Sequence, residues 1–146
     1  MKISMKKIDG FIASDHRGFK LKKHLKENFS LIDLGVFDDK KKVDYPDYAK
    51  KLCNLVKKEK SRGILICGTG IGMSIAANRY KGIRAALCHD VKDAELARKH
   101  NDANVLVLSG DFTKKEDAQE IVKKFFNTPF SGEIRHKRRI KKIDYQ

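Results

Sequence analysis

The chain has 146 residues, of which 40% are hydrophobic, and a formal net charge of +14. This length fits a single domain with a full core, residues 1–146, and the apolar content excludes a disordered chain. No apolar run approaches the length of a membrane span and no apolar signal segment follows the basic N-terminus, so we expect a cytoplasmic protein without a membrane partner.

Short apolar runs alternate with helical patterns along the chain. Predicted strands cover residues 8–14, 31–34, 63–66, 83–88 and 105–108. Apolar stripes predict helices over 19–29, 44–56, 91–100 and 118–126, an alanine-rich helix after residue 72, and a last helix that begins at Ser131 or Gly132. Strand and helix alternate at roughly thirty residues per unit, which predicts an α/β fold with a five-stranded parallel sheet covered on both faces.

The charge and the cysteines narrow the possible partners. The basic residues are mostly lysines spread over helix faces without interleaved aromatics, so we expect no nucleic-acid partner. Cys53, Cys67 and Cys88 are an odd set without C-x-x-C spacing. This pattern favours reduced thiols in a cytosolic protein and argues against a zinc site.

Ligands of parallel sheets bind beyond the carboxyl ends of the strands. Six candidate residues follow predicted strands there: Asp15, His16, Cys67, Thr69, His89 and Asp90. His100 and Asn101 end the fourth main helix, which by connectivity points back toward the amino ends of the strands. His100 therefore either has a partner elsewhere or meets Cys67 through a second chain.

The stretch GILICGTGIGMSIAAN, residues 63–78, is the strongest functional signal. It places Cys67 at the end of a buried strand, before a glycine turn that opens a helix. Glycines let backbone amides approach an anion, and a helix N-terminus adds positive potential that favours a thiolate. We expect a nucleophile or a general base beside an anionic ligand.

This loop has three alternative interpretations. A phosphate-binding P-loop needs Lys and Ser or Thr after its last glycine, where this chain has Met73 and Ser74. The dinucleotide fingerprint needs G-x-G-x-x-G, whereas here the third glycine comes one residue early, although Asp90 ends the next strand. A buried structural cysteine before a tight turn stays open.

Basic residues share one face of the last predicted helix: Arg135, Arg138, Arg139 and Lys142. Arginines one turn apart can bind a phosphate bidentately. A solvated basic face and a nucleic-acid arm are the alternatives that spacing alone leaves open.

Five segments, in order, resemble one family, the type B ribose-5-phosphate isomerases, which are related to the subunits of galactose-6-phosphate isomerase. They are SDHRGFKLK (14–22), VDYPDYA (43–49), GILICGTGIGMSIAANR (63–79), ARKHNDANVL (97–106) and RHKRRI (135–140). The resemblance implies a Rossmann-like three-layer α/β/α sandwich without metal or cofactor. It also implies a homodimer or dimer of dimers, with active sites shared between subunits and a C-terminal helix that reaches a partner subunit.

The resemblance further implies roles for particular residues. Cys67 matches the catalytic base, Thr69 its supporting hydroxyl, and His100 the group that opens the sugar ring. Residues that match substrate-binding positions are Asp15, His16, Gly68, Gly70, Ile71, Gly72, Asn101, Arg135 and Arg139, with Tyr45 as a further candidate.

Several positions distinguish this chain from other members of the family. One branch replaces the cysteine by serine and uses a glutamate where this chain has Met73, so Cys67 places it in the cysteine branch. Asp111 stands where many members have a basic residue, and Arg17 where a small residue is usual.

The expected activity is interconversion of ribose 5-phosphate and ribulose 5-phosphate through a cis-enediol, a step of the pentose phosphate pathway. The alternatives are an isomerase of galactose 6-phosphate or allose 6-phosphate, and a nonenzymatic phosphosugar- or nucleotide-binding module.

Overall fold

A parallel sheet forms the centre of the computed structural model, which describes residues 8–145. Its strands are β1 (Phe11–Ser14), β2 (Ile32–Asp33), β3 (Gly63–Cys67), β4 (Ala85–Leu87) and β5 (Val105–Ser109), in the order β2-β1-β3-β5-β4. All pairings are parallel. The predicted sheet is confirmed, but three predicted strands are too long, because apolar residues such as Ile8 are buried outside the ladders.

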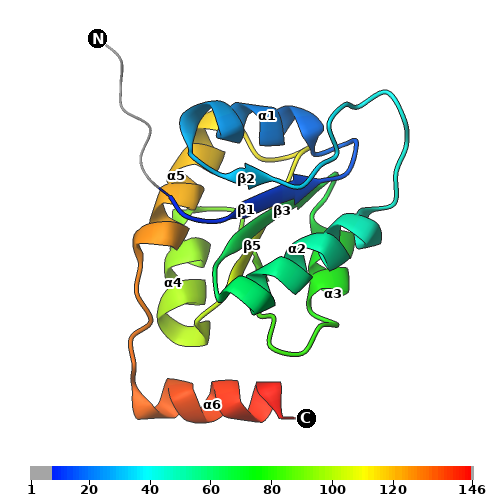
Figure 1. The fold of residues 1–146 in the computed structure, drawn as a ribbon. Coiled ribbons are helices and arrows are strands. Elements are labelled where there is room, and N and C mark those ends of the chain that lie inside the picture. The colour runs from blue at the N-terminus through cyan, green and yellow to red at the C-terminus, as the bar shows by residue number, and fades with distance from the viewer. Residues whose placement is uncertain (1–7, 146) are drawn as a thin grey trace.

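Helices cover both faces of the sheet (Figure 1). One face packs against α1 (Phe19–Asn28), α4 (Val91–Asn101) and α5 (Lys115–Asn127), and the other against α2 (Tyr45–Glu59) and α3 (Ile71–Ala77). The last helix, α6 (Ile134–Asp144), lies outside these layers beyond the end of α4. The predicted three-layer α/β/α sandwich is confirmed.

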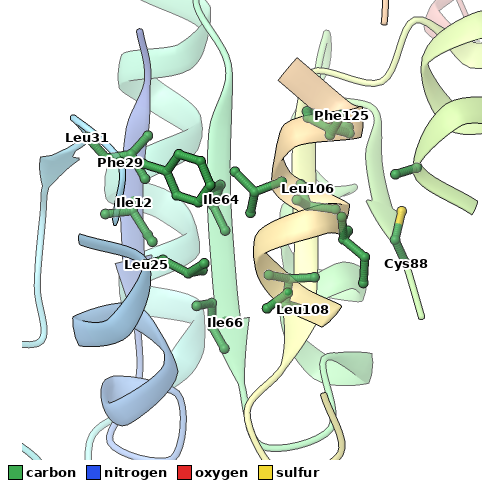
Figure 2. Packing of buried hydrophobic residues seen from close by; sticks show 14 of the residues in the cluster. Ile12, Leu25, Phe29, Leu31, Ile64, Ile66, Cys88, Leu106, Leu108 and Phe125 are labelled. Carbon is green, nitrogen blue, oxygen red and sulfur yellow. The ribbon is translucent and has the colours of Figure 1, made fainter. Parts of the chain in front are cut away.

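The period of two along each strand divides the core into two clusters. On β3, Ile64 and Ile66 face α1 and α5, whereas Leu65 and Cys67 face α2 and α3. Figure 2 shows the first cluster, in which side chains from β1, β3 and β5 pack against those of α1 and α5. The central strands are buried on both faces, which explains their continuous apolar sequences.

Helix α6 begins later than the sequence predicts. Gly132 has a φ of +74°, outside helical conformation, and Glu133 is the N-cap, so a start at Ser131 or Gly132 is wrong. The helix is held by His136, which is buried, and by an ion pair of 2.9 Å between Arg84 Nη1 and Asp144 Oδ2. These contacts place α6 across the end of α4 and the segment before β4.

None of the helices within residues 8–145 combines the length and the apolar character that crossing a membrane requires.

Candidate active site

Three loops meet at the carboxyl edge of the sheet, which is the side where the parallel strands end. Backbone contacts hold these loops together. The loop after β5 donates from Gly110 N to Cys67 O (2.8 Å) and from Asp111 N to Gly68 O (3.0 Å). Ser109 Oγ donates to Gly68 O at 2.7 Å. The loop after β1 joins through Asp15 N, which donates to Ile66 O at 3.2 Å. The glycine loop after β3 is therefore fixed from both sides.

Cys67 ends β3 and is only 4% exposed. Its Sγ accepts a hydrogen bond from Gly70 N at 3.1 Å. This contact needs Gly70 at a φ of +84°, a left-handed conformation that glycine adopts without steric cost. An amide aimed at the sulfur stabilises a thiolate there.

The other two cysteines have different surroundings. Cys53 and Cys88 are free and buried, and burial raises the pKa of each thiol to about 12. Neither thiol has the glycine turn that follows Cys67. A purely structural role therefore fits Cys53 and Cys88 better than it fits Cys67.

The rest of the glycine loop presents polar groups. Thr69 Oγ1 accepts from Ile71 N at 3.2 Å, which leaves the hydroxyl proton free to donate. Gly72 lies under the ring of Tyr45, since a Cβ placed there would be 2.6 Å from Tyr45 Oη. Tyr45 is 37% exposed and opens α2, so the turn Asp44–Asp47 places a phenol at the site.

Asp15 and His16 extend this edge from the loop after β1. Asp15 is buried, and its Oδ1 accepts from Arg17 N at 2.9 Å and Gly18 N at 3.0 Å. His16 Nδ1 accepts from Val43 N at 3.1 Å. An accepting Nδ1 places the proton of a neutral imidazole on Nε2, which is then the donor left for a ligand.

Asp90 has a structural role instead. Its carboxylate caps α4 by accepting from Asp93 N at 2.8 Å, while His89 N donates to Asp93 Oδ2 at 3.0 Å. The carboxylate that a dinucleotide site would use for a ribose is thus occupied by the helix cap.

A second cluster lies at the end of α4. The rings of His100 and His136 have centroids 4.4 Å apart, and His136 Nδ1 is 2.9 Å from Ser131 Oγ. Burial lowers the pKa of His136, and the neighbouring positive charges lower it further. Arg135 Nε pairs with Glu133 at 3.0 Å, and Arg139 is exposed on the same helix.

The two clusters lie at opposite ends of the strands, the first at the carboxyl ends and the second at the amino ends. Asn101 ends α4, and Asn104, just before β5, accepts through its carbonyl from Gly63 N at the amino end of β3. Four residue steps along β3 separate Gly63 from Cys67, about 13 Å at the usual rise per residue. One chain thus brings Asp15, His16, the glycine loop and Tyr45 to the same end of the strands as Cys67, but not His100, Asn101, Arg135 or Arg139.

The cavities fit this separation. Five cavities of about 210 to 610 Å³ lie on the described surface, and Cys67 lines none of the five. Ser61, which precedes β3, lines three of these cavities, and Ile143 of α6 lines the other two. None of these five cavities lies at the carboxyl ends of the strands. Within residues 8–145, no three His, Cys, Asp or Glu side chains gather to hold a metal ion.

The protein is an α/β protein whose parallel sheet is covered by helices on both faces. Proteins of this class bind small ligands in the loops beyond the carboxyl ends of their strands. Comparison with known proteins narrows this class. The family model described as Ribose/Galactose Isomerase matches residues 11–143. The chain therefore belongs to the ribose/galactose isomerase family and is an isomerase.

Individual relatives agree with this assignment. A probable ribose-5-phosphate isomerase B of Mycoplasma genitalium is 49% identical and covers 91% of each chain. A putative sugar phosphate isomerase of Rickettsia bellii is 48% identical over 96% of this chain and all of the relative. The crystal structure of a ribose 5-phosphate isomerase from Thermotoga maritima has a TM-score of 0.89 at 50% identity, covering 95% of this chain and 99% of that one. The resemblance to type B ribose-5-phosphate isomerases is confirmed.

Proposed function

We propose that the protein interconverts D-ribose 5-phosphate and D-ribulose 5-phosphate through a cis-enediolate, as a step of the pentose phosphate pathway. The observation that carries this proposal is the contact of Gly70 N with Cys67 Sγ, in a chain of the ribose/galactose isomerase family. Related proteins named as ribose-5-phosphate isomerases support the pentose substrate.

Cys67 is the proposed base. Its thiolate removes the proton from C2 of the open-chain aldose, and the electron pair moves through C1 to the carbonyl oxygen. The resulting thiol returns a proton to C1, while the proton on O2 passes to O1, which completes the ketose. One group that both accepts and returns a proton suits this reaction, because the proton moves between neighbouring carbons.

Donors around Cys67 support the developing charge in this proposal. The amides of the glycine loop and the hydroxyl of Thr69 would stabilise the enediolate oxygens, at about 3 kcal/mol for each well-aimed donor. The Nε2 proton of His16 is available because Nδ1 is engaged by Val43 N. Asp15 and Tyr45 would complete the binding surface around the sugar.

The remaining groups come from a second chain in our proposal. His100 of the partner subunit would open the furanose ring, with Asn101 of the partner subunit beside it. Arg135 and Arg139 of the partner subunit would bind the phosphate, which positions the sugar carbons against the thiol. The length of β3, about 13 Å from Gly63 to Cys67, separates the two clusters within one chain and supports this arrangement.

Exposed apolar side chains favour the association of subunits that this site needs. Ile71 and Ile75 of α3 are 58% and 57% exposed, and Ile134 of α6 is 80% exposed. A homodimer or a dimer of dimers would cover such residues. Free thiols are consistent with a cytoplasmic, reducing compartment.

A mixing experiment tests the shared site. Chains carrying Cys67→Ala and His100→Ala are purified separately, mixed and allowed to exchange subunits. We expect each variant alone to be inactive, and the mixture to recover up to about a quarter of wild-type turnover, because half of the chains form heterodimers with one intact site each. No recovery in heterodimers verified by mass spectrometry would contradict the shared site.

A hexose phosphate is the second candidate substrate, because the matching family model names galactose as well as ribose. A panel of ribose 5-phosphate, galactose 6-phosphate and allose 6-phosphate distinguishes them, with Cys67→Ala protein as the background control. The highest kcat/KM is expected for ribose 5-phosphate. Binding of these sugars without turnover would instead indicate a binding module.

A further inference from the structure

Arg17 is a cationic side chain at the carboxyl edge that the mechanism above does not use. It lies in the turn between β1 and α1, where its backbone N–H is held by Asp15 Oδ1. Its guanidinium extends across the glycine loop and rests on Gly68, since a Cβ at Gly68 would overlap Arg17 Cζ. Gly68 directly follows Cys67, so the guanidinium lies one residue from the proposed base.

Asp111 holds the guanidinium in this position. Arg17 Nη2 pairs with Asp111 Oδ2, and the backbone N–H of Asp111 donates to Gly68 O at 3.0 Å. The carboxylate is therefore fixed to the same loop that the guanidinium covers. Each guanidinium has five N–H donors, and in the described part of the chain this pair is its one hydrogen bond. Other donors remain for a ligand.

Neighbouring charges favour the charged form of Arg17. The pKa of Arg17 is raised, first by its hydrogen bond and charge interaction with Asp111, then by Asp15 and by Cys67. An ordinary surface ion pair contributes little to stability, and Arg17 and Asp111 are 52% and 34% exposed. A role in folding alone therefore explains this placement poorly.

The charges of Arg17 and Asp111 also suit the binding of an anionic substrate. A carboxylate at position 111 would repel a phosphate bound at this edge, and pairing with Arg17 removes that repulsion. Arginine binds phosphate through charge-assisted, often bidentate hydrogen bonds. Within one chain, Arg135 and Arg139 lie at the opposite edge and cannot serve here.

We propose that Arg17 donates to the phosphate of the sugar bound against Cys67, and that Asp111 is its positioning residue. This inference rests on the proposed function, because it assumes a phosphorylated sugar at that edge. Arg17 then contributes to specificity for phosphorylated over neutral sugars.

The test combines kinetics with a binding measurement. KM and kcat for ribose 5-phosphate are measured for the wild type and for Arg17→Ala, together with the Kd of inorganic phosphate by calorimetry. We expect Arg17→Ala to raise KM and the phosphate Kd at least about tenfold, while kcat changes less than about threefold. Lys20→Ala is the matched control, because it removes an exposed positive charge from the adjacent helix and should change neither constant.

Two double variants separate binding from a purely structural pair. Arg17→Ala with Asp111→Ala should bind phosphate more tightly than Arg17→Ala alone, because no unpaired carboxylate remains. Arg17→Ala with Asp111→Arg should recover most of the lost affinity, because a guanidinium returns to the same loop. A structural pair would instead change the thermal midpoint without changing either constant.

The outcomes distinguish this inference from the proposed function. Normal turnover with unchanged KM and phosphate Kd in Arg17→Ala overturns the role of Arg17 and leaves the isomerase intact. Absence of turnover in the wild type, with phosphate binding that depends on Arg17, overturns the proposed reaction and leaves the anion site. A wild type that does not bind phosphate overturns the role of Arg17.

Discussion

Cys67 and Cys88 occupy similar places in the sequence but different environments in the fold. Each lies at the carboxyl end of a parallel strand, β3 or β4, and before a helix. Cys67 Sγ accepts the amide of Gly70 at 3.1 Å. Cys88 packs into the cluster of Figure 2, 1% exposed, with Sγ 3.6 Å from the carbonyl of Ala86.

The difference comes from the residues that follow each cysteine. After Cys67, Gly70 turns the chain so that its N–H meets the sulfur. After Cys88, Asp90 uses its own carboxylate to cap α4, and nearby acids raise the pKa of the buried thiol beyond the effect of burial. A strand end alone therefore does not make a reactive thiol. The glycine turn distinguishes Cys67, because it aims an amide at the sulfur.

The largest expected effect comes from removing the sulfur. Cys67→Ala should lower kcat about a thousandfold or more, within the range for loss of an acid–base group, while circular dichroism stays native. Cys88→Ala is the matched control and should keep kcat within a few-fold, at a stability cost of about 1 to 2 kcal/mol for the small cavity. Comparable losses of kcat in both variants would erase the distinction between the two thiols.

The glycine turn can be tested without touching either sulfur. Gly70→Ala places a Cβ 2.5 Å from Leu87 Cδ1 and should lower kcat about a hundredfold by moving the amide off Cys67. Gly132→Ala is the control, since Gly132 also has a positive φ but nothing lies within 4 Å of its added Cβ. Its left-handed backbone should cost about 1 to 2 kcal/mol of stability without loss of kcat. Full activity of Gly70→Ala would show that the amide contact is not needed.

Alkylation compares the thiols directly in the wild-type protein. Iodoacetamide at pH 7.5 should modify Cys67 at least about tenfold faster than Cys53 or Cys88, because burial raises the pKa of those two thiols to about 12 and the thiolate is the reactive form. Peptide mass spectrometry at timed intervals measures the three rates, and a denatured sample gives the rates without the fold. Modification of Cys88 before Cys67 would reverse the assignment.

The smallest effect is on stability at alkaline pH. The folded-state pKa of Cys88, about 12, lies above its ordinary value of 9.0, so the stability that the protonated thiol contributes is present below pH 9 and is lost as pH rises toward 12. For this group the loss between pH 9 and pH 10 is about 1 kcal/mol. Urea unfolding at both pH values should show that Cys88→Ala loses less stability than the wild type over this interval. Equal losses would mean that Cys88 ionises as readily when folded as when unfolded.

The sequence by itself determined the alternation of strands and helices and which polar residues follow the strands. Because side-chain direction alternates along a strand and parallel strands need helical crossovers, short apolar runs and amphipathic stripes were sufficient to predict the sandwich. Strand ends were predicted poorly, as at residues 8–14 and 83–88, because pairing depends on neighbours far away in the chain. The start of α6 was missed for a similar reason, since Gly132 turns the chain first.

Only the tertiary structure decided how the candidate residues are grouped. Connectivity already predicted that His100 points away from Cys67, and the fold places them at opposite edges of the sheet. The pairing of Arg17 with Asp111, 94 residues apart, could not be read from either local sequence. Local patterns record propensity and periodicity, whereas such contacts depend on how three separate loops pack at one edge. That packing brings a guanidinium, a carboxylate and a thiol together around one glycine.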